Sequence, residues 1–546
     1  MDRAGGIREE PDELTDAEPV PSSLPDGGRN TLLRWLRIGL AGSIAVYVAL
    51  AAIWAFAVPL FAPLDESAHV DYAYQVAHGG LPLAGTHYQA EFPTLHQRSG
   101  GQYVAYHPPL YYALISPLIR LADPSSHPRV WLLAVRGVGI VLTIGTLLLV
   151  AMLAVRVFAK WDRARRYQLA IIAVGLAAGV PSLVAATASI QNDALELFLS
   201  LLALVLLAVM ARDGLTARRV LVLGLVCGLG MLTRVTFGQV LVVAALTVVL
   251  LAHPRFSARP WPAAAARPRL TILRRQAAYL APVILGPVLI AGWFYVLNHN
   301  RYGSFSGSNI AYQGVAARSL NPRMSNPLHF ATDPYSWWAQ LVQLGGATSS
   351  LVNNPRTVST VIATLLTVVV VLGLGGLALR WRTFRLDRAG AILLIGLALI
   401  LLISFAEIAS HVSHKGSENN RYLLGALPFW GIALGVLLLA LGSRRLPVIP
   451  VVIVAAQALG AITLTVSIAR RQRLVAGHTG TYDALLTSMR QARVPMPSAM
   501  LAGLTALLVA GLLAQLVALV ALGRRRVPAE GHTGAVEDRP TSMQPA

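Results

Sequence analysis

Long apolar runs follow one another along almost the whole chain and are separated by short polar segments. Most runs are about 20 residues long, which is the length that an α-helix needs to cross a bilayer. Within a run, apolar and polar positions do not alternate as they would in the strands of a transmembrane barrel. We therefore predict an all-α polytopic membrane protein with about 12 transmembrane helices. These are expected near residues 36–60, 130–157, 168–188, 193–211, 218–233, 236–252, 278–297, 357–379, 389–409, 422–441, 447–468 and 499–522.

The composition supports a membrane protein. Of the 546 residues, 55% are hydrophobic and 13% are charged, whereas soluble proteins carry about 25% charged residues. A soluble protein with several very apolar core helices is disfavoured, because too many runs are long enough to span a bilayer. No small-residue cleavage site follows the first run, so residues 36–60 are expected to remain as a signal anchor. The single cysteine, Cys227, rules out a disulfide within the chain.

The basic residues indicate the orientation. The net charge is +20, and the arginines gather in short loops such as "RDGLTARR" and "RWRTFRLDR". The positive-inside rule places these loops in the cytoplasm, so no nucleic-acid partner is needed to explain the charge. We expect a multi-pass protein of the inner (plasma) membrane, with disordered cytoplasmic tails at 1–31 and 524–546. The transmembrane domain would cover 32–523, with long external loops at 61–128 and 298–356.

Two features of the external segments differ from simple connectors. The stretch "LYYALISPLIRLA" is apolar but short for a span and follows two prolines, so we expect a helix at the membrane interface. The segment 469–498 contains Arg470, Arg471 and Arg473, which is unusual outside. Either the last helix is misplaced, or these arginines serve a lipid headgroup or a phosphate.

The first candidate for chemistry is "PLDESAHVDYAYQ", directly after the first apolar run. Asp65 and Glu66 could simply be carboxylates that face water at a helix end. However, His69 would lie one turn beyond Glu66 on the same helical face. A carboxylate at a partly desolvated interface can act as a general base, and we therefore consider this group a candidate active site.

The second and third candidates are "YHPPLYYAL" and "ASIQNDALELFLSLLAL". The prolines of the first stretch predict a rigid turn, but His107 would stand at a helix start, where phosphates bind readily. In the second stretch an N-cap role is sufficient to explain Asn192, and Asp193 suits the same position. Glu196 lies one turn into an apolar helix, and an intramembrane acid is a functional candidate by default.

Two further stretches supply cations. In "GMLTRVTFG", Arg234 could snorkel to lipid headgroups or bind a phosphate through two parallel hydrogen bonds. The stretch "SHVSHKGSENNRYLLGALPFW" could be a solvated connector, but Arg421 leads directly into an apolar helix. Its pair His411 and His414 is a weak indication of a metal site, because a third ligand is not apparent.

Taken together, these stretches resemble the GT-C superfamily of membrane glycosyltransferases, which use polyprenyl-phosphate sugars. The resemblance lies in the acidic pair Asp65 and Glu66, the "PPL-Tyr" stretch, the Asn-Asp pair that opens a helix, and the Thr-basic pair ending at Arg234. "PLDESAH" and "NNRYLLGALP" are similar to a bacterial branch with a Pro-x-Asp-Glu signature. The resemblance covers Asp65 to about Pro428.

The resemblance implies roles for individual residues. Asp65 would be the general base for the acceptor hydroxyl, with Glu66 as its neighbour or substitute, and Asp193 would match a second acidic position. Arg234 and Arg421 would contact the donor phosphate. The remaining candidates are His107 at the phosphate and, in supporting places, His69, Asn192, Lys415 and Glu418.

The residues themselves fit an inverting transfer of sugar from a polyprenyl-phosphate donor to a cell-envelope acceptor outside the membrane. Such a reaction needs one base and cations for the phosphate leaving group. It requires no cofactor, although carboxylates of related sites sometimes hold a divalent cation. The alternatives are a transporter or flippase for lipid-linked sugars, for which Glu196 and Glu407 are the only indications, and an envelope ligase or polymerase.

Overall fold

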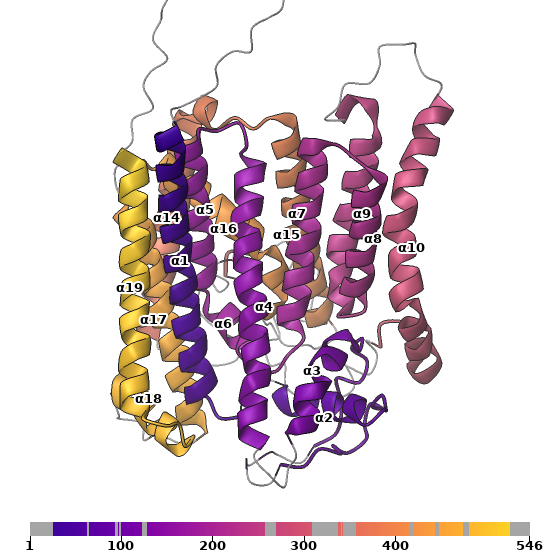
Figure 1. Ribbon diagram of the computed structural model, residues 1–546, viewed down its shortest axis with the longest axis vertical. Helices are drawn as coiled ribbons and strands as arrows, with labels where there is room; N and C mark the ends of the chain where they lie inside the picture. The colour runs from indigo at the N-terminus through magenta and orange to yellow at the C-terminus, as the bar shows by residue number, and fades with distance from the viewer. Residues whose placement is uncertain are drawn as a thin grey trace, which may run out of the picture.

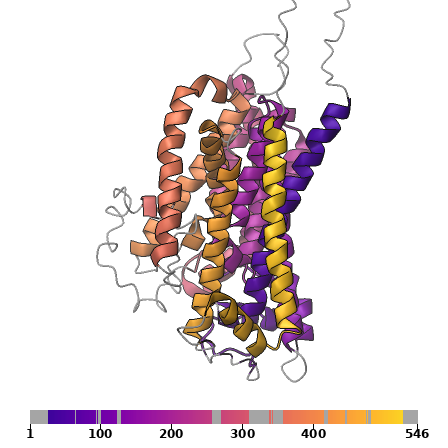
Figure 2. The same cartoon turned by 90° about the vertical axis from the view of Figure 1, so that its left-hand side faces the viewer.

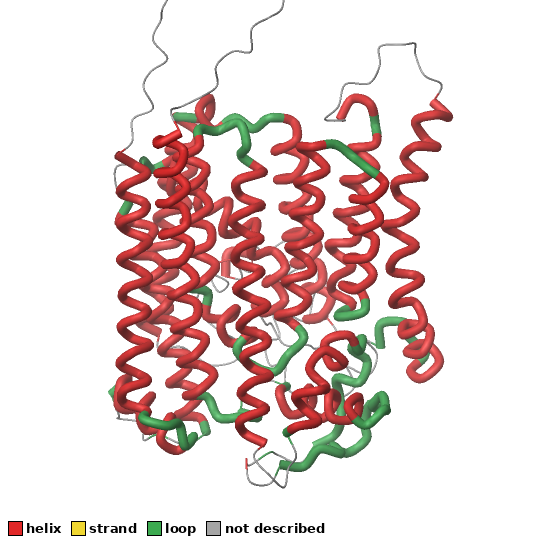
Figure 3. The backbone as a smooth tube through the Cα atoms, in the orientation of Figure 1, coloured by secondary structure: helices red, strands yellow, loops and turns green. Residues whose placement is uncertain are grey.

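The computed structural model describes residues 26–524, apart from 63–64, 93–94, 96, 98–99, 123–127, 257–268, 308–336, 340, 342–355, 414–419, 443–446, 473–474 and 476–479. The described part is mostly helical (Figure 3). Many of its loops are short, but a long one joins α2, which ends at Ala77, to α3, which begins at Leu110. One isolated β-bridge pairs His87 with Gly101. The predicted all-α architecture is therefore confirmed.

Long helices stand side by side and form a bundle (Figure 1). They are α1 (Asp26–Ala57), α4 (Pro128–Val157), α5 (Arg163–Ala178), α7 (Asp193–Asp213), α8 (Ala217–Met231), α9 (Gly238–Ala252), α10 (Arg269–Tyr302), α14 (Arg356–Leu379), α15 (Arg388–Ser413), α16 (Leu427–Ala440), α17 (Val448–Arg471) and α19 (Pro497–Arg524). Shorter elements are α2 (Glu66–Ala77), α3 (Leu110–Leu121), α6 (Pro181–Thr187), α18 (Thr481–Gln491) and the 3₁₀ turns η2 (Val235–Phe237), η3 (Pro254–Phe256), η5 (Trp381–Phe384) and η6 (Asn420–Ala426).

Ten helices of the described chain are long and apolar enough to cross a membrane, or 11 if a bent pair counts as one span. The bent pair is α5 and α6, whose axes differ by 65° at a break before Pro181. Helix α8 has 15 residues, which is about 22 Å of helix and short of the roughly 30 Å hydrocarbon core. The predicted count of about twelve is therefore not confirmed, although the multi-pass character is.

Helices α8 and α10 pack closely, and this contact positions the segment that follows α8. A Cβ added to Gly224 of α8 would lie 2.2 Å from the carbonyl oxygen of Pro282 in α10. One added to Gly286 would lie 2.1 Å from the carbonyl oxygen of Gly224. Only glycine permits this approach of two backbones, a common device between membrane helices. The packing fixes the end of α8, from which the chain continues to Arg234.

The two ends of the bundle differ in chemistry. The first turn of α1 and the last turn of α19 lie at the same end (Figures 1 and 2). At that end the interhelical loops are tied by arginines: Arg212 pairs with Asp387, and Arg165 donates to the carbonyl of Thr383. The short helices α2, α3 and α18 lie at the opposite end. Helix α19 begins at Pro497, close to the start of the predicted last span. The last helix was therefore not misplaced, and a misplaced helix does not explain why Arg470 and Arg471 lie at this end.

Candidate active site

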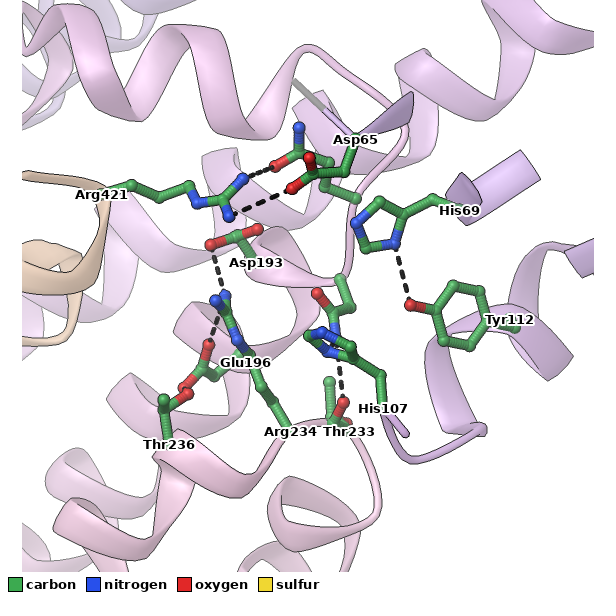
Figure 4. Close-up of polar contacts among 12 residues, drawn as sticks. Asp65, His69, His107, Tyr112, Asp193, Glu196, Thr233, Arg234, Thr236 and Arg421 are labelled. Carbon is green, nitrogen blue, oxygen red and sulfur yellow. Dashed lines mark hydrogen bonds and ion pairs between the residues drawn. The ribbon is translucent and has the colours of Figure 1, made fainter. Parts of the chain in front are cut away.

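The candidate residues come together at the end that carries α2 and α3, although they are far apart in the sequence (Figure 4). Asp65 stands directly before α2, His107 precedes α3, and Asp193 opens α7. Arg234 lies between α8 and α9, and Arg421 lies in η6. Each is at or beyond a helix end, where a charged side chain can reach water without crossing the apolar layer.

Asp65 is the most accessible acid of the group. Its side chain is 33% exposed, and that of its partner Arg421 is 10% exposed. Asp65 Oδ1 accepts a hydrogen bond of 2.8 Å from the hydroxyl of Tyr103, and Oδ2 lies 3.4 Å from Arg421 Nη2. Burial disfavours the charged form, but the positive charge of Arg421 leads the opposing contributions and the pKa of Asp65 lies below its usual value. Asp65 is therefore a carboxylate at neutral pH.

Glu66 is buried, and its carboxylate is bound by an arginine and by two backbone amides. Its side chain and that of Arg136 in α4 are both 0% exposed and form an ion pair of 2.7 Å. The backbone amides of Phe61 and Ile190 donate to the same carboxylate, at 2.8 and 2.9 Å. Arg136 donates in turn to the carbonyls of Ala55, Val58 and Pro59. The pair joins α1, α2, α4 and the turn before α7, and a catalytic role for Glu66 finds no support in this geometry.

The histidine of α2, His69, lies in the same cluster as Asp65 (Figure 4), and the charge of Asp65 acts on its ring. The backbone amide of His69 donates to the carbonyl of Asp65 in the first turn of α2. His69 Nδ1 lies 2.8 Å from the hydroxyl of Tyr112, which is stacked on Tyr72 with ring centroids 3.7 Å apart. Burial lowers the pKa of His69 to about 4, so it is neutral at physiological pH.

Arg234 is held by two carboxylates of α7. It pairs with Asp193, and its Nη1 lies 3.2 Å from Glu196 Oε2. Thr236 donates to the other oxygen of Glu196. Arg234 adopts an extended backbone after the end of α8, directly before η2 and α9. An arginine that is neutralised by protein carboxylates is preorganised, and a ligand anion could compete for its donors.

Arg421 connects Asp65 to a small cavity. Its Nη1 lies 3.0 Å from Gln191 Oε1, while Nη2 approaches Asp65. The cavity has a volume of about 20 Å³ and is lined by both arginines, by Asp193, Glu196, Thr236 and Gln239, and by Leu197, Tyr422, Leu424 and Gly425. This volume corresponds to about one water molecule. A larger ligand requires the ion pairs to separate.

Asn192 does not cap α7 through its side chain, which corrects the N-cap interpretation. It precedes α7 with helical backbone angles and makes no side-chain cap hydrogen bond. Its amide nitrogen lies 3.0 Å from His107 Nδ1 and 3.1 Å from the carbonyl oxygen of Thr233. The amide therefore links the turn before α3 to the turn before η2. Burial, followed by the charge of Arg234, holds the pKa of His107 well below its usual range.

The predicted loop before Arg421 is only partly described. His414, Lys415 and Glu418 lie outside the described residues. His411 lies in the last turn of α15, and its ring centroid is 5.0 Å from that of Tyr422. Among the residues that the structure describes, no group of three or more His, Cys, Asp or Glu side chains could hold a metal ion.

Three residues of the site were missed in the sequence: Arg136, Tyr103 and Gln191. Arg136 lies inside the predicted span 130–157, and an arginine within an apolar run was a signal of function or pairing. Nothing in the local sequence marks Tyr103 or Gln191, because their importance comes from contacts to Asp65 and Arg421.

Residues 106–273 match the family model described as dolichyl-phosphate-mannose-protein mannosyltransferase. This segment includes His107, Asn192, Asp193 and Arg234. Over this part of the chain, which is less than half of its length, the sequence is similar to a family of membrane mannosyltransferases. The match supports the resemblance to the GT-C glycosyltransferases drawn from the sequence. No curated protein matches this chain.

Among solved structures, the chain is similar to ArnT from Cupriavidus metallidurans in the apo state and bound to undecaprenyl phosphate. Each match has 16% identity over 87% of this chain and 76% of the ArnT chain, with TM-scores of 0.44 and 0.45. The oligosaccharyltransferase of Archaeoglobus fulgidus matches with 13% identity over 83% of this chain and 56% of its own, with a TM-score of 0.40. The roles of the site residues therefore rest on the geometry of this chain.

Proposed function

We propose that this chain is a glycosyltransferase that moves a sugar from a polyprenyl-phosphate donor to a cell-envelope acceptor and inverts the anomeric centre of the sugar. One observation carries the proposal: Arg421 lines the polar cavity and also contacts Asp65. A carboxylate base and cations for a phosphate thus share one site at a membrane boundary. The matched family description names a sugar on dolichyl phosphate, which is a polyprenyl phosphate.

In the proposed reaction, Asp65 takes the proton of the acceptor hydroxyl as its oxygen attacks the anomeric carbon. The bond between that carbon and the phosphate oxygen breaks, and the electron pair stays on the phosphate. Arg234 and Arg421 stabilise the charge on this leaving group. They must first be released in part from Asp193 and Asp65. We assign these steps to a catalytic domain of residues 32–523, with Asp193 as the residue that holds Arg234 in place.

The outer face is the proposed location of the site. The loops that Arg212 and Arg165 hold together lie at the end opposite to α2 and α3, and so do the first turn of α1 and the last turn of α19. The positive-inside rule places that basic end in the cytoplasm. The site then faces outward in the inner membrane, where a lipid-borne sugar and an envelope acceptor can meet, with both termini inside.

The test uses the full chain in lipid nanodiscs with radiolabelled polyprenyl-phosphate sugars and membrane-derived acceptors. We expect turnover of one donor, and a loss of roughly 10²- to 10⁴-fold in Asp65→Asn. Asp213→Asn is the matched control, because Asp213 is a half-exposed carboxylate at the basic end. A second assay uses the chain reconstituted in sealed lipid vesicles. If no donor turns over but labelled lipid crosses the vesicle bilayer, the chain is a flippase and the proposal is wrong.

A further inference from the structure

The imidazole of His107 is held from several sides. The amide of His107 donates to the carbonyl of Val104 at 2.9 Å, and its carbonyl accepts from the hydroxyl of Tyr72 at 2.8 Å. On the ring, Nδ1 lies 3.0 Å from the amide nitrogen of Asn192. No hydrogen-bond partner of Nε2 is found among the described residues. The ring is therefore fixed in place with one nitrogen engaged and one available.

The orientation of the Asn192 amide follows from Thr233. A carbonyl oxygen can only accept hydrogen bonds, and the backbone oxygen of Thr233 lies 3.1 Å from Asn192 Nδ2. Turning the amide over would place its own oxygen against this carbonyl, so that two acceptors would face each other. The NH₂ group must therefore lie on the side of Thr233, where one of its hydrogens serves the carbonyl and the other points to His107.

This arrangement determines the tautomer of His107. The amide nitrogen of Asn192 can only donate, so His107 Nδ1 must accept and carries no proton. Burial and the nearby charge of Arg234 keep the ring neutral at physiological pH, because they hold the pKa of His107 well below its usual range. The one proton of a neutral imidazole must then be on Nε2. His107 thus offers a single N–H donor and no positive charge.

The two residues that orient the His107 ring are next in sequence to charged residues of the site. Asn192 directly precedes Asp193, and Thr233 directly precedes Arg234. The two residues that orient His107 are thus the chain neighbours of the two that form the ion pair of the site. Figure 4 shows His107 and Thr233 beside Arg234, within the same cluster as Asp65 and His69. The charge of Arg234 acts on the His107 ring, so a ligand phosphate that reached Arg234 would lie near that ring.

We propose that Asn192 is a positioning residue that holds His107 as the Nε2–H tautomer, so that His107 donates a hydrogen bond to the departing phosphate beside Arg234. This inference rests on the proposed function. His107 keeps its proton throughout: the acceptor proton goes to Asp65, and the electron pair of the broken bond stays on the phosphate oxygen. The added group is thus a neutral donor that stabilises the leaving group without changing the charge of the site.

The tautomer can be measured without any substrate. The full chain is labelled with ¹⁵N-histidine in nanodiscs, and the His107 signals are identified by their loss in His107→Gln. We expect an unprotonated Nδ1 and a protonated Nε2 near neutral pH. In Asn192→Ala the two tautomers should mix, whereas the control His253→Gln, at the basic end, should leave the His107 signals unchanged. A protonated Nδ1 in the wild type would overturn the inference.

The role in phosphate departure is tested by two replacements of His107. A glutamine amide can place an N–H near the position of Nε2, whereas an asparagine amide is too short and reaches only the position of Nδ1. We expect His107→Asn to lower kcat roughly 10²-fold, as for loss of one oxyanion donor, while the donor KM changes little. His107→Gln should retain activity within about tenfold of the wild type. Equal losses in both variants would contradict the role.

The two measurements separate failure of this inference from failure of the proposed function. If the wild type turns over a donor but Nδ1 is protonated, the positioning role of Asn192 is wrong and the transferase proposal stands. If the predicted tautomer is found but no donor turns over, the proposed function is wrong, and with it the phosphate role of His107. If Asn192→Ala mixes the tautomers and lowers kcat, while the acid limb of the pH–rate profile, which reports the ionisation of Asp65, stays in place, both proposals are supported.

Discussion

Asp65 and Glu66 are adjacent in the sequence, and the structure uses them in opposite ways. Glu66 is fully buried, and its carboxylate is satisfied by Arg136 and two backbone amides. Asp65 is one-third exposed and is paired at 3.4 Å with an arginine that also lines a cavity. The first arrangement holds helices together, and the second leaves a carboxylate that a ligand can reach. Two neighbouring acids in a motif therefore need not share a function.

The largest expected effect comes from Glu66→Gln. It leaves Arg136 buried without a counter-charge, which should cost about 3–5 kcal/mol of stability. Asp65→Asn, in contrast, should barely move the unfolding midpoint, because a partly exposed pair contributes about 0–1 kcal/mol. Thermal unfolding in nanodiscs measures both. The double variant Glu66→Leu with Arg136→Met removes both charges, but it also leaves two backbone amides and three carbonyls without their partners, so only part of the stability should return. A Glu66→Gln protein with normal stability but no turnover would reverse the assignment.

An intermediate effect is expected from the arginines at the two ends of the bundle. Arg421→Gln removes a cation from the proposed leaving-group site and should lower kcat/KM by roughly 10²- to 10³-fold. Arg156→Gln serves as the control, because Arg156 forms an exposed pair with Asp213 at the basic end. That change should alter activity and stability little. Steady-state kinetics with the donor that the wild type turns over would show the contrast, and similar losses in both variants would argue against a phosphate role.

The smallest expected effect is a shift of the pH profile in Tyr103→Phe. The Tyr103 hydroxyl donates to Asp65 and helps to keep its pKa below the usual value. As a base, Asp65 must be ionised, so activity is present above its pKa and is lost as the pH falls through it. Without the hydroxyl the pKa rises, and the acid limb of kcat/KM should move to higher pH. The same substitution at Tyr482, an exposed residue of α18, should leave the limb in place.

Much of the fold could be predicted, because a membrane span is a local property of the sequence. Every predicted run coincides with a helix or a helix pair. The errors concern continuity. The run 168–188 is broken before Pro181, which lacks the amide that a continuing helix would need. The run 218–233 ends as a helix at Met231, before the turn that carries Arg234.

The site was predicted as a set of residues but not as a set of contacts. Acids and arginines at the outer ends of apolar runs marked Asp65, Asp193, Arg234 and Arg421. Their partners depend on how distant helices pack. Glu66 meets Arg136 at a separation of 70 positions, which no local pattern specifies. Helix packing also determines the partner of Asn192. Its side-chain amide donates to the carbonyl of Thr233 and not to a backbone group of its own helix.

The span of sequence that separates Asp65 from Arg421 has a consequence for biogenesis. The two residues are 356 positions apart, so at synthesis rates of about 5–20 residues per second the arginine follows the acid by roughly 20 to 70 seconds. During that interval three carboxylates, Asp65, Asp193 and Glu196, await full compensation, and Arg234 is the first arginine of the cluster to join them. Insertion of the segment with Arg421 reduces this charge imbalance, and the proposed active centre is completed only when the late helices have entered the membrane.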